Sequence, residues 1–209
     1  MPDLCELVAP GHTAIITQEC QRGVIGAESA LPELAESARV SGMIDNVARL
    51  VAAGRRAGVE IIHHVATHRP DMRGANHNAR LFRAMARRGG PQLAGSEMIE
   101  IAEPISVADS DIISTRLHGL GPIAGTDIDS ILRNLGTTTV VILGVSSNVA
   151  IPNAVFDAVN LAYEVVVPRD GIAGVPTAYT DTIVDNSLSL VATITTTAEL
   201  VACWEEHAS

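Results

Sequence analysis

Short runs of β-branched and aliphatic residues alternate along this chain with longer segments of helical periodicity, and this alternation limits the possible folds more than any other feature. Such runs are typical of strands that are buried on both faces. Parallel neighbours must be joined by crossovers, usually helices, that cover the sheet. The pattern therefore predicts an α/β fold, a single three-layer domain with a six-stranded, mostly parallel sheet and helices on both faces. The strands are expected at residues 13–17, 59–64, 111–114, 138–143, 164–167 and 191–195.

Two helices can be bounded from the sequence. One begins near Ser41, since Ile44, Val47, Leu50 and Val51 recur at three- and four-residue spacing, and it ends at Gly58. The other covers residues 127–135 and ends at Gly136. No repeat, low-complexity tract or Ser/Pro-rich linker divides the chain, so we expect one domain over residues 1–209.

Composition excludes several classes of function. The 209 residues carry 14 basic and 24 acidic side chains, a net charge of −10, and every basic side chain is an arginine. The acidic balance argues against a nucleic-acid partner. The absence of lysine excludes Schiff-base chemistry, attachment of pyridoxal phosphate and a phosphate-loop lysine. No apolar run is long enough to span a bilayer, so no membrane partner is expected.

Cysteine usage points to a reducing compartment. The three cysteines, Cys5, Cys20 and Cys203, are too few and too scattered to predict a disulfide framework. Residues 1–6 lack the basic and apolar regions of a secretory signal. We therefore expect a cytoplasmic protein without disulfides.

One segment departs from the acidic average. Residues 69–88 hold six arginines and a single acid, Asp71, and Arg80, Arg83 and Arg87 share one helical face, with Leu81 and Met85 facing elsewhere. Two interpretations remain open. The segment is either a solvated or subunit-docking face, or an electrostatic funnel for a carboxylate substrate.

Polar residues follow three of the predicted strands, where loops of a parallel sheet converge on ligands. The first strand leads into Glu19, Cys20 and Gln21, and the third leads into Arg116 and His118. The central strand leads into residues 144–150, which open a helix. Ser146 and Ser147 are the expected N-caps of this helix, and the backbone N–H groups around Val149 and Ala150 form a candidate anion pocket.

A set of short motifs resembles the isochorismatase-like hydrolases, also called cysteine hydrolases. The resemblance covers residues 12 to 200 and implies a six-stranded parallel sheet between helices. It also implies a homo-oligomer and a non-proline cis peptide between Val145 and Ser146. The motifs are Gly125-Thr126-Asp127, Leu135-Gly136, Gly144-Val145, Asp157-Ala158, residues 163–167 and Asp170.

The family uses an aspartate, a lysine and a cysteine at the three strand ends. Here Glu19 takes the aspartate position, Arg116 or else His118 lies near the lysine position, and Ala150 takes the cysteine position. A methyl group is no nucleophile, so the resemblance implies a member without the triad and without thiolate chemistry at position 150.

The resulting hypothesis is a hydrolase that acts on a small, carboxylate-bearing metabolite by noncovalent acid/base chemistry. Glu19 is the acid or base, Arg116 either clamps the substrate or simply pairs with Glu19, and His118 can carry a proton. A paired arginine is expected to depress the Glu19 pKa. The substrate-binding residues are expected to be Gln21, Ser146, Ser147, Asn148 and Ala150.

Three alternatives stay open. The chain can be a catalytically silent member that binds a small anion or serves as an assembly subunit. It can also use Ser146, Ser147 or Cys20 as a covalent nucleophile. Finally, the histidines at positions 63, 64, 68 and 77 invite a metal site, but His63 and His64 face opposite sides of a strand and no Asp-x-His pair follows. We expect neither a metal nor another cofactor.

Overall fold

The computed structural model describes residues 3–87 and 92–207. Six parallel strands form one sheet in the order β3-β2-β1-β4-β5-β7, and a two-residue strand pairs with β4 outside this path. The six-stranded parallel sheet predicted from the sequence is confirmed, and the short strand β6 is an addition to it. The strands are β1 (Thr13–Gln18), β2 (Glu60–Ala66), β3 (Ile112–Arg116), β4 (Thr139–Val145), β5 (Glu164–Pro168), β6 (Ile172–Ala173) and β7 (Thr193–Thr195).

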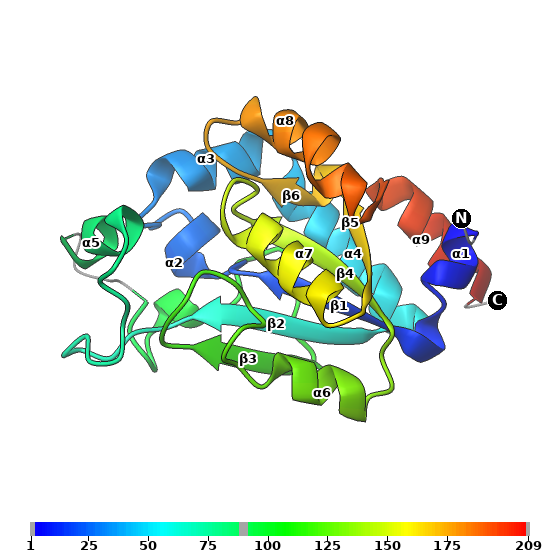
Figure 1. The fold of residues 1–209 in the computed structure, drawn as a ribbon, viewed down its shortest axis with the longest axis horizontal. Helices are drawn as coiled ribbons and strands as arrows, with labels where there is room; N and C mark the ends of the chain where they lie inside the picture. The colour runs from blue at the N-terminus through cyan, green and yellow to red at the C-terminus, as the bar shows by residue number, and fades with distance from the viewer. Residues whose placement is uncertain (1–2, 88–91, 208–209) are drawn as a thin grey trace.

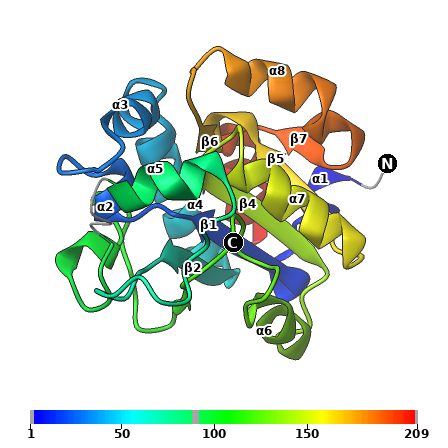
Figure 2. The same cartoon turned by 60° about the vertical axis from the view of Figure 1, so that its left-hand side comes forward.

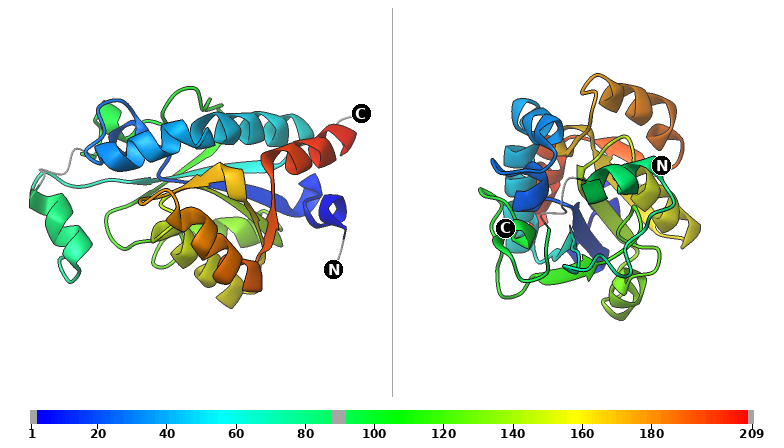
Figure 3. Two further views of the ribbon diagram at one scale, coloured as in Figure 1. Left: turned by 90° about the horizontal axis from the view of Figure 1, so that it is seen from above. Right: turned by 90° about the vertical axis from the view of Figure 1, so that its left-hand side faces the viewer.

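Helices cover both faces of the sheet, which gives three layers (Figures 1 and 3). One face packs against α1 (Leu4–Leu7), α3 (Pro32–Val40), α4 (Met43–Ala57) and α9 (Thr197–His207). The other packs against α6 (Ile128–Asn134), α7 (Ala150–Asn160) and α8 (Tyr179–Asn186). Two further helices, α2 (Arg22–Ile25) and α5 (Arg80–Arg87), lie near the carboxyl ends of the strands. Single 3-10 turns occur at Pro10–His12, Glu97–Ile99, Arg169–Gly171 and Leu188–Leu190.

The strand β1 illustrates why an unbroken apolar run folds this way. Ile15 packs into the core beneath α4, whereas Ala14 and Ile16 pack into the core beneath α6 and α7. Because successive side chains alternate between faces, a strand buried on both sides must be apolar at every position. The glycine stops are also confirmed: Gly58 and Gly136 adopt φ values of 85° and 71°, which suit glycine at a helix end.

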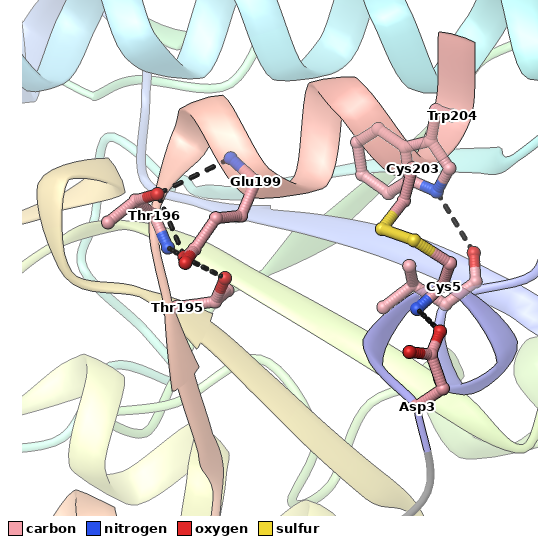
Figure 4. The surroundings of a disulfide bond; sticks show 8 residues. Asp3, Cys5, Thr195, Thr196, Glu199, Cys203 and Trp204 are labelled. Atoms are coloured by element: carbon pink, nitrogen blue, oxygen red, sulfur yellow. Dashed lines mark hydrogen bonds between the residues drawn. A yellow bond between two sulfur atoms is a disulfide. The ribbon is translucent and has the colours of Figure 1, made fainter. Parts of the chain in front are cut away.

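A disulfide joins the two ends of the chain, and the expectation that none forms is wrong. Cys5 on α1 and Cys203 on α9 are bonded, with their Cα atoms 4.9 Å apart (Figure 4). This bond could not be predicted from the sequence because the two cysteines are separated by 198 residues and only the fold brings them together. Cysteine usage therefore no longer argues for a reducing compartment. In residues 3–87 and 92–207, no helix combines the length and hydropathy that crossing a membrane requires.

The disulfide lies within a larger contact between the terminal helices. Trp204, which is 1% exposed, donates a hydrogen bond from Nε1 to the carbonyl oxygen of Val8 at 2.9 Å. Asp3 caps α1 by accepting a hydrogen bond from the Cys5 amide at 2.9 Å (Figure 4). The covalent bond thus reinforces an interface that packing and hydrogen bonds already define.

We predict that the Cys5→Ser, Cys203→Ser double variant is less stable than the wild type by about 2–4 kcal/mol, because the unfolded chain loses a crosslink. Urea unfolding followed by circular dichroism measures the difference. Dithiothreitol should lower the wild-type midpoint and leave that of the double variant where it is. Equal midpoints for oxidised wild type and double variant would contradict this role for the bond.

Candidate functional site

A cavity of about 300 Å³ opens at the carboxyl ends of the central strands. This is the edge of the sheet that the arrowheads of β2 and β3 point toward, beneath α5 (Figure 1). Side chains that follow β1, β3 and β4 contribute to its lining, as expected for a parallel sheet. A cavity of this size suits a small molecule.

Glu19 reaches the cavity from a sharp turn at the end of β1. Its φ of 51° is positive, which is uncommon for a residue other than glycine, and its amide donates to the His64 carbonyl oxygen at 2.9 Å. Gly144 on the neighbouring strand β4 leaves space for this turn. A Cβ at that position would lie 2.3 Å from the Gln18 carbonyl oxygen and 2.8 Å from Cys20 Sγ. Glycine at 144 therefore allows the turn that carries Glu19.

Glu19 forms an ion pair with Arg116 at the end of β3. The carboxylate atom Oε1 accepts from Arg116 Nη2, and the two side chains are 16% and 9% exposed. Arg116 Nη1 also donates to the carbonyl oxygens of Gly119, at 2.7 Å, and His118, at 3.2 Å. Of the two interpretations of Arg116, this geometry supports the partner of Glu19, because two of its three nitrogens already have protein acceptors.

The pKa of Glu19 is raised, because burial outweighs the paired Arg116, which lowers it as expected. Burial, which disfavours the charged carboxylate, is the largest cause, and the charge and hydrogen bond of Arg116 offset only part of it. A raised pKa brings the group closer to the range in which a carboxyl can both give and take a proton near neutral pH.

The loop between β4 and α7 contains the expected cis peptide between Val145 and Ser146. The expected N-caps are wrong: Val149 is the N-cap of α7, and no side chain caps that helix. Ser147 is 1% exposed, and its Oγ lies 2.8 Å from Thr180 Oγ1 on α8. Its hydroxyl therefore contacts α8 and does not cap α7. Asn148 donates from Nδ2 to the Val175 carbonyl oxygen at 3.0 Å.

The backbone amides at this helix start are only partly available. Those of Val149 and Ile151 donate to the Ser146 carbonyl oxygen at 3.2 Å and 3.0 Å. The amides of Asn148 and Ala150 are therefore the candidates for an anion pocket. Ala150 is 5% exposed and lines the cavity.

Most of the expected site residues meet in the cavity, and two do not. Those that line it are Glu19, Arg116, His118, Ser146, Asn148 and Ala150. Ser147 and Gln21 are not among the lining residues. Gln21 is fully buried, and its side-chain amide bonds both the N–H and the carbonyl oxygen of Ala66, at 2.7 Å and 2.8 Å. It joins the turn after β1 to the end of β2.

Cys20 faces away from the cavity, as strand alternation predicts. Its thiol is fully buried, lies 3.7 Å from the Gln18 carbonyl oxygen, and has its pKa raised to about 12 by burial and by the charge of Glu19. A thiol with this pKa is not a thiolate at neutral pH. No cysteine is found among the described residues that line the cavity.

The outer wall of the cavity was not predicted from the sequence. Met72, Leu81, Phe82 and Met85 line it, and three of these lie on α5, which extends across the carboxyl ends of the central strands (Figures 2 and 3). The expectation that Leu81 and Met85 face elsewhere than the arginines is confirmed. The signal for their role was the same helical periodicity, which places apolar residues opposite Arg80, Arg83 and Arg87.

The histidines of β2 are buried in separate hydrogen-bonded sets on opposite faces. His63 Nδ1 lies 2.8 Å from Thr17 Oγ1, and its Nε2 lies 3.3 Å from Asp111 Oδ2. His64 Nδ1 lies 3.2 Å from Ser114 Oγ. Within residues 3–87 and 92–207, no three His, Cys, Asp or Glu side chains are grouped so as to hold a metal ion.

Comparison with known proteins gives a consistent family. A model of the isochorismatase domain matches residues 13–199. A protein of Arabidopsis thaliana named "Probable inactive nicotinamidase" is 29% identical over 182 residues, which cover 83% of this chain and 87% of that protein. A ureidoacrylate amidohydrolase of Rhizobium rhizogenes is 26% identical over 171 residues, covering 74% and 67% of the two chains.

Solved structures share the fold at lower identity. The crystal structure of a cysteine hydrolase from Pseudomonas syringae matches with a TM-score of 0.82 at 21% identity, covering 95% of this chain and 94% of that one. An N-carbamoylsarcosine amidase from Thermoplasma acidophilum matches with a TM-score of 0.71 at 19% identity, covering 89% and 96%.

We predict that acid destabilises the protein through His64. Burial, and to a lesser extent the charge of Arg116, lowers its pKa from 6.5 to about 3. As the pH falls through 6.5 the unfolded chain binds a proton that the folded chain refuses down to about pH 3, so stability decreases across this window. The loss is on the order of a few kcal/mol.

Chemical denaturation at a series of pH values measures this effect. The variant His64→Gln should show a shallower decrease of stability below pH 6.5 than the wild type. The matched change at the exposed His77, His77→Gln, should leave the wild-type slope unchanged. A His64→Gln slope as steep as that of the wild type would assign the acid sensitivity to other groups.

Proposed function

The chain belongs to the isochorismatase family, and on that premise we propose that it hydrolyses a small metabolite by noncovalent acid/base chemistry, with Glu19 as the proton-transferring group. The observation that carries the proposal is the joint position of three groups on one cavity: the Glu19 carboxyl, the Arg116 guanidinium and the Ala150 methyl. The carboxyl and the cation can support proton transfer and charge stabilisation, whereas the methyl cannot attack.

The proposal assigns Ala150 to the position that the nucleophilic cysteine takes in cysteine hydrolases. Support comes from its place at the start of α7, after β4 and the cis peptide between Val145 and Ser146. The other cysteines offer no replacement, since Cys20 is buried and Cys5 and Cys203 are bonded to each other. Water is then the attacking group, and a general acid or base must move its protons.

Glu19 suits that task because burial raises its pKa while part of its side chain remains open to the cavity. We assign Arg116 to positioning: it fixes the Glu19 carboxylate and, through the carbonyl oxygens of His118 and Gly119, the loop after β3. His118 lines the cavity and is a second candidate for proton transfer. The amides of Asn148 and Ala150 would stabilise negative charge that develops on the substrate.

A second candidate function is ligand binding without turnover. The ion pair between Glu19 and Arg116 favours this alternative, because a carboxylate held in an ion pair must leave that pair, or share it, to accept a proton. The sequence relative from Arabidopsis bears the name "Probable inactive nicotinamidase". A compound that raises the melting temperature and is recovered unchanged would support this alternative.

We predict that Glu19→Gln lowers turnover at least about 100-fold, because the amide cannot exchange protons. The substrate is first found by incubating the wild type with a panel of small amides, ureides and vinyl ethers and detecting products by mass spectrometry. Glu19→Asp should keep part of the activity, and Cys20→Ala should keep all of it. Full activity of Glu19→Gln would end the assignment of Glu19.

We also propose a homo-oligomer, in line with the family resemblance. Large apolar side chains are exposed at several places, among them Leu190 at 79%, Val40 at 58% and Val107 at 50%. Association would remove such surface from water. Light scattering at micromolar concentration should give a mass above that of one 21.9 kDa chain. A mass of one chain at all concentrations would contradict the proposal.

A further inference from the structure

The lining of the cavity is divided into a polar floor and an apolar outer wall. The floor consists of the strand ends with Glu19, Arg116 and Ser146, whereas the outer wall is formed by Met72, Leu81, Phe82 and Met85. No side chain of α5 is buried, although its apolar face is turned to the cavity. Leu81 is 43% exposed. A molecule bound against this wall would remove exposed apolar surface from water, which favours binding.

The wall is held in place at its base. His68 pairs with Leu93 in a parallel bridge, with the His68 amide donating to the Gln92 carbonyl oxygen at 2.7 Å and the Ala94 amide donating to the His68 carbonyl oxygen at 3.0 Å. Asn76 Oδ1 accepts from the Gly119 amide at 2.8 Å, which joins this segment to the loop after β3. These bonds anchor the segment that carries the wall on both sides of α5, at His68 and Asn76 before it and at residues 92–94 after it.

The charged side chains of the cavity do not favour a carboxylate ligand. Arg116 is the only arginine among the described lining residues, and its guanidinium already serves Glu19 and two carbonyl oxygens. The arginines of residues 69–87 are absent from that lining, so within the described chain the funnel interpretation gains no support. The cavity also holds two acids, Glu19 and Glu33. A bound carboxylate would meet these acids and an arginine whose two terminal nitrogens are already engaged, while its unpartnered Nε is buried.

We propose that the ligand of this cavity is an uncharged small molecule with a polar head at the Glu19–Arg116 end and a hydrocarbon body of several carbons against Met72, Leu81, Phe82 and Met85. This inference rests on the proposed function in that it concerns the same site, and it replaces the carboxylate-bearing substrate expected from the sequence. Specificity for the body belongs to α5, and Phe82 and Met85 are its specificity-determining residues.

The test is an NMR titration of the full chain at pH 8 with three probes: hexanamide, acetamide and hexanoate. At this pH an ordinary histidine is neutral, so a charged imidazole does not assist hexanoate. Hexanamide should bind at least tenfold more tightly than acetamide, since each buried methylene contributes favourably, and at least tenfold more tightly than hexanoate, which bears the charge. Hexanoate binding as tight as hexanamide, or no hexanamide binding up to 50 mM, would overturn the proposal.

Variants on the two faces of α5 provide the control. The double variant Phe82→Ala, Met85→Ala should weaken hexanamide at least fivefold and leave acetamide unchanged, whereas Arg87→Gln, on the arginine face, should change neither. Equal hexanamide affinity in the double variant and the wild type would overturn the assignment of α5. Signals of α5 that respond to protein concentration and not to hexanamide would assign its apolar face to a second copy of the chain and also overturn the proposal.

The outcomes for this inference and for the proposed function are separable. Hexanamide binding without turnover of any panel compound would contradict hydrolysis and leave the ligand class standing. Turnover confined to carboxylate-bearing compounds, with loss on Glu19→Gln, would support hydrolysis and contradict the ligand class.

Discussion

The central strand β1 and the glycine beside its end set the geometry of the whole site. β1 is hydrogen-bonded to β2 on one edge and to β4 on the other, and its side chains are buried on both faces. The strand cannot slide without moving both cores, because a shift of one residue would exchange its two faces. At its end, Gly144 leaves room for the turn that points Glu19 into the cavity. The same backbone contacts thus fix both the central strand and the place of the Glu19 carboxyl in the cavity.

Burial and charge pairing act on Glu19 in opposite directions, and burial is the larger effect. A carboxyl at a strand end would ordinarily be ionised and solvated. Here the surrounding loops exclude most of the water, and Arg116 replaces only part of the lost hydration. The Glu19 carboxyl is therefore protonated more easily than a solvated carboxyl would be.

The sequence predicted those features that depend on local pattern. The strands of the six-stranded path and the stops at Gly58 and Gly136 follow from periodicity and backbone preference, which need no knowledge of distant contacts. The helix α9 was not predicted, although Thr196 and Glu199 form a capping box that marks its start: the Thr196 amide donates to Glu199 Oε2 at 2.9 Å (Figure 4).

Other features depend on packing between distant segments and could not be predicted from local pattern. The bond between Cys5 and Cys203 needs α1 beside α9, and the role of Gln21 needs the turn after β1 beside the end of β2. The pKa of Glu19 depends on how completely three loops close around it. For Ser146 and Ser147, the preference of serine for helix starts was overridden by the backbone path after Val145, which moves the start of α7 to Ala150.

The bridge between His68 and Leu93 has a consequence for how such a protein can change over time. The segment that carries α5 begins after His68 and ends before Leu93. Because His68 and Leu93 pair with each other, the two ends of this segment are neighbours. Insertions or deletions between these two points leave the register of β1, β2 and β4 untouched, since the ends to be joined stay where they are. The floor with Glu19 and the wall on α5 can consequently diverge at independent rates.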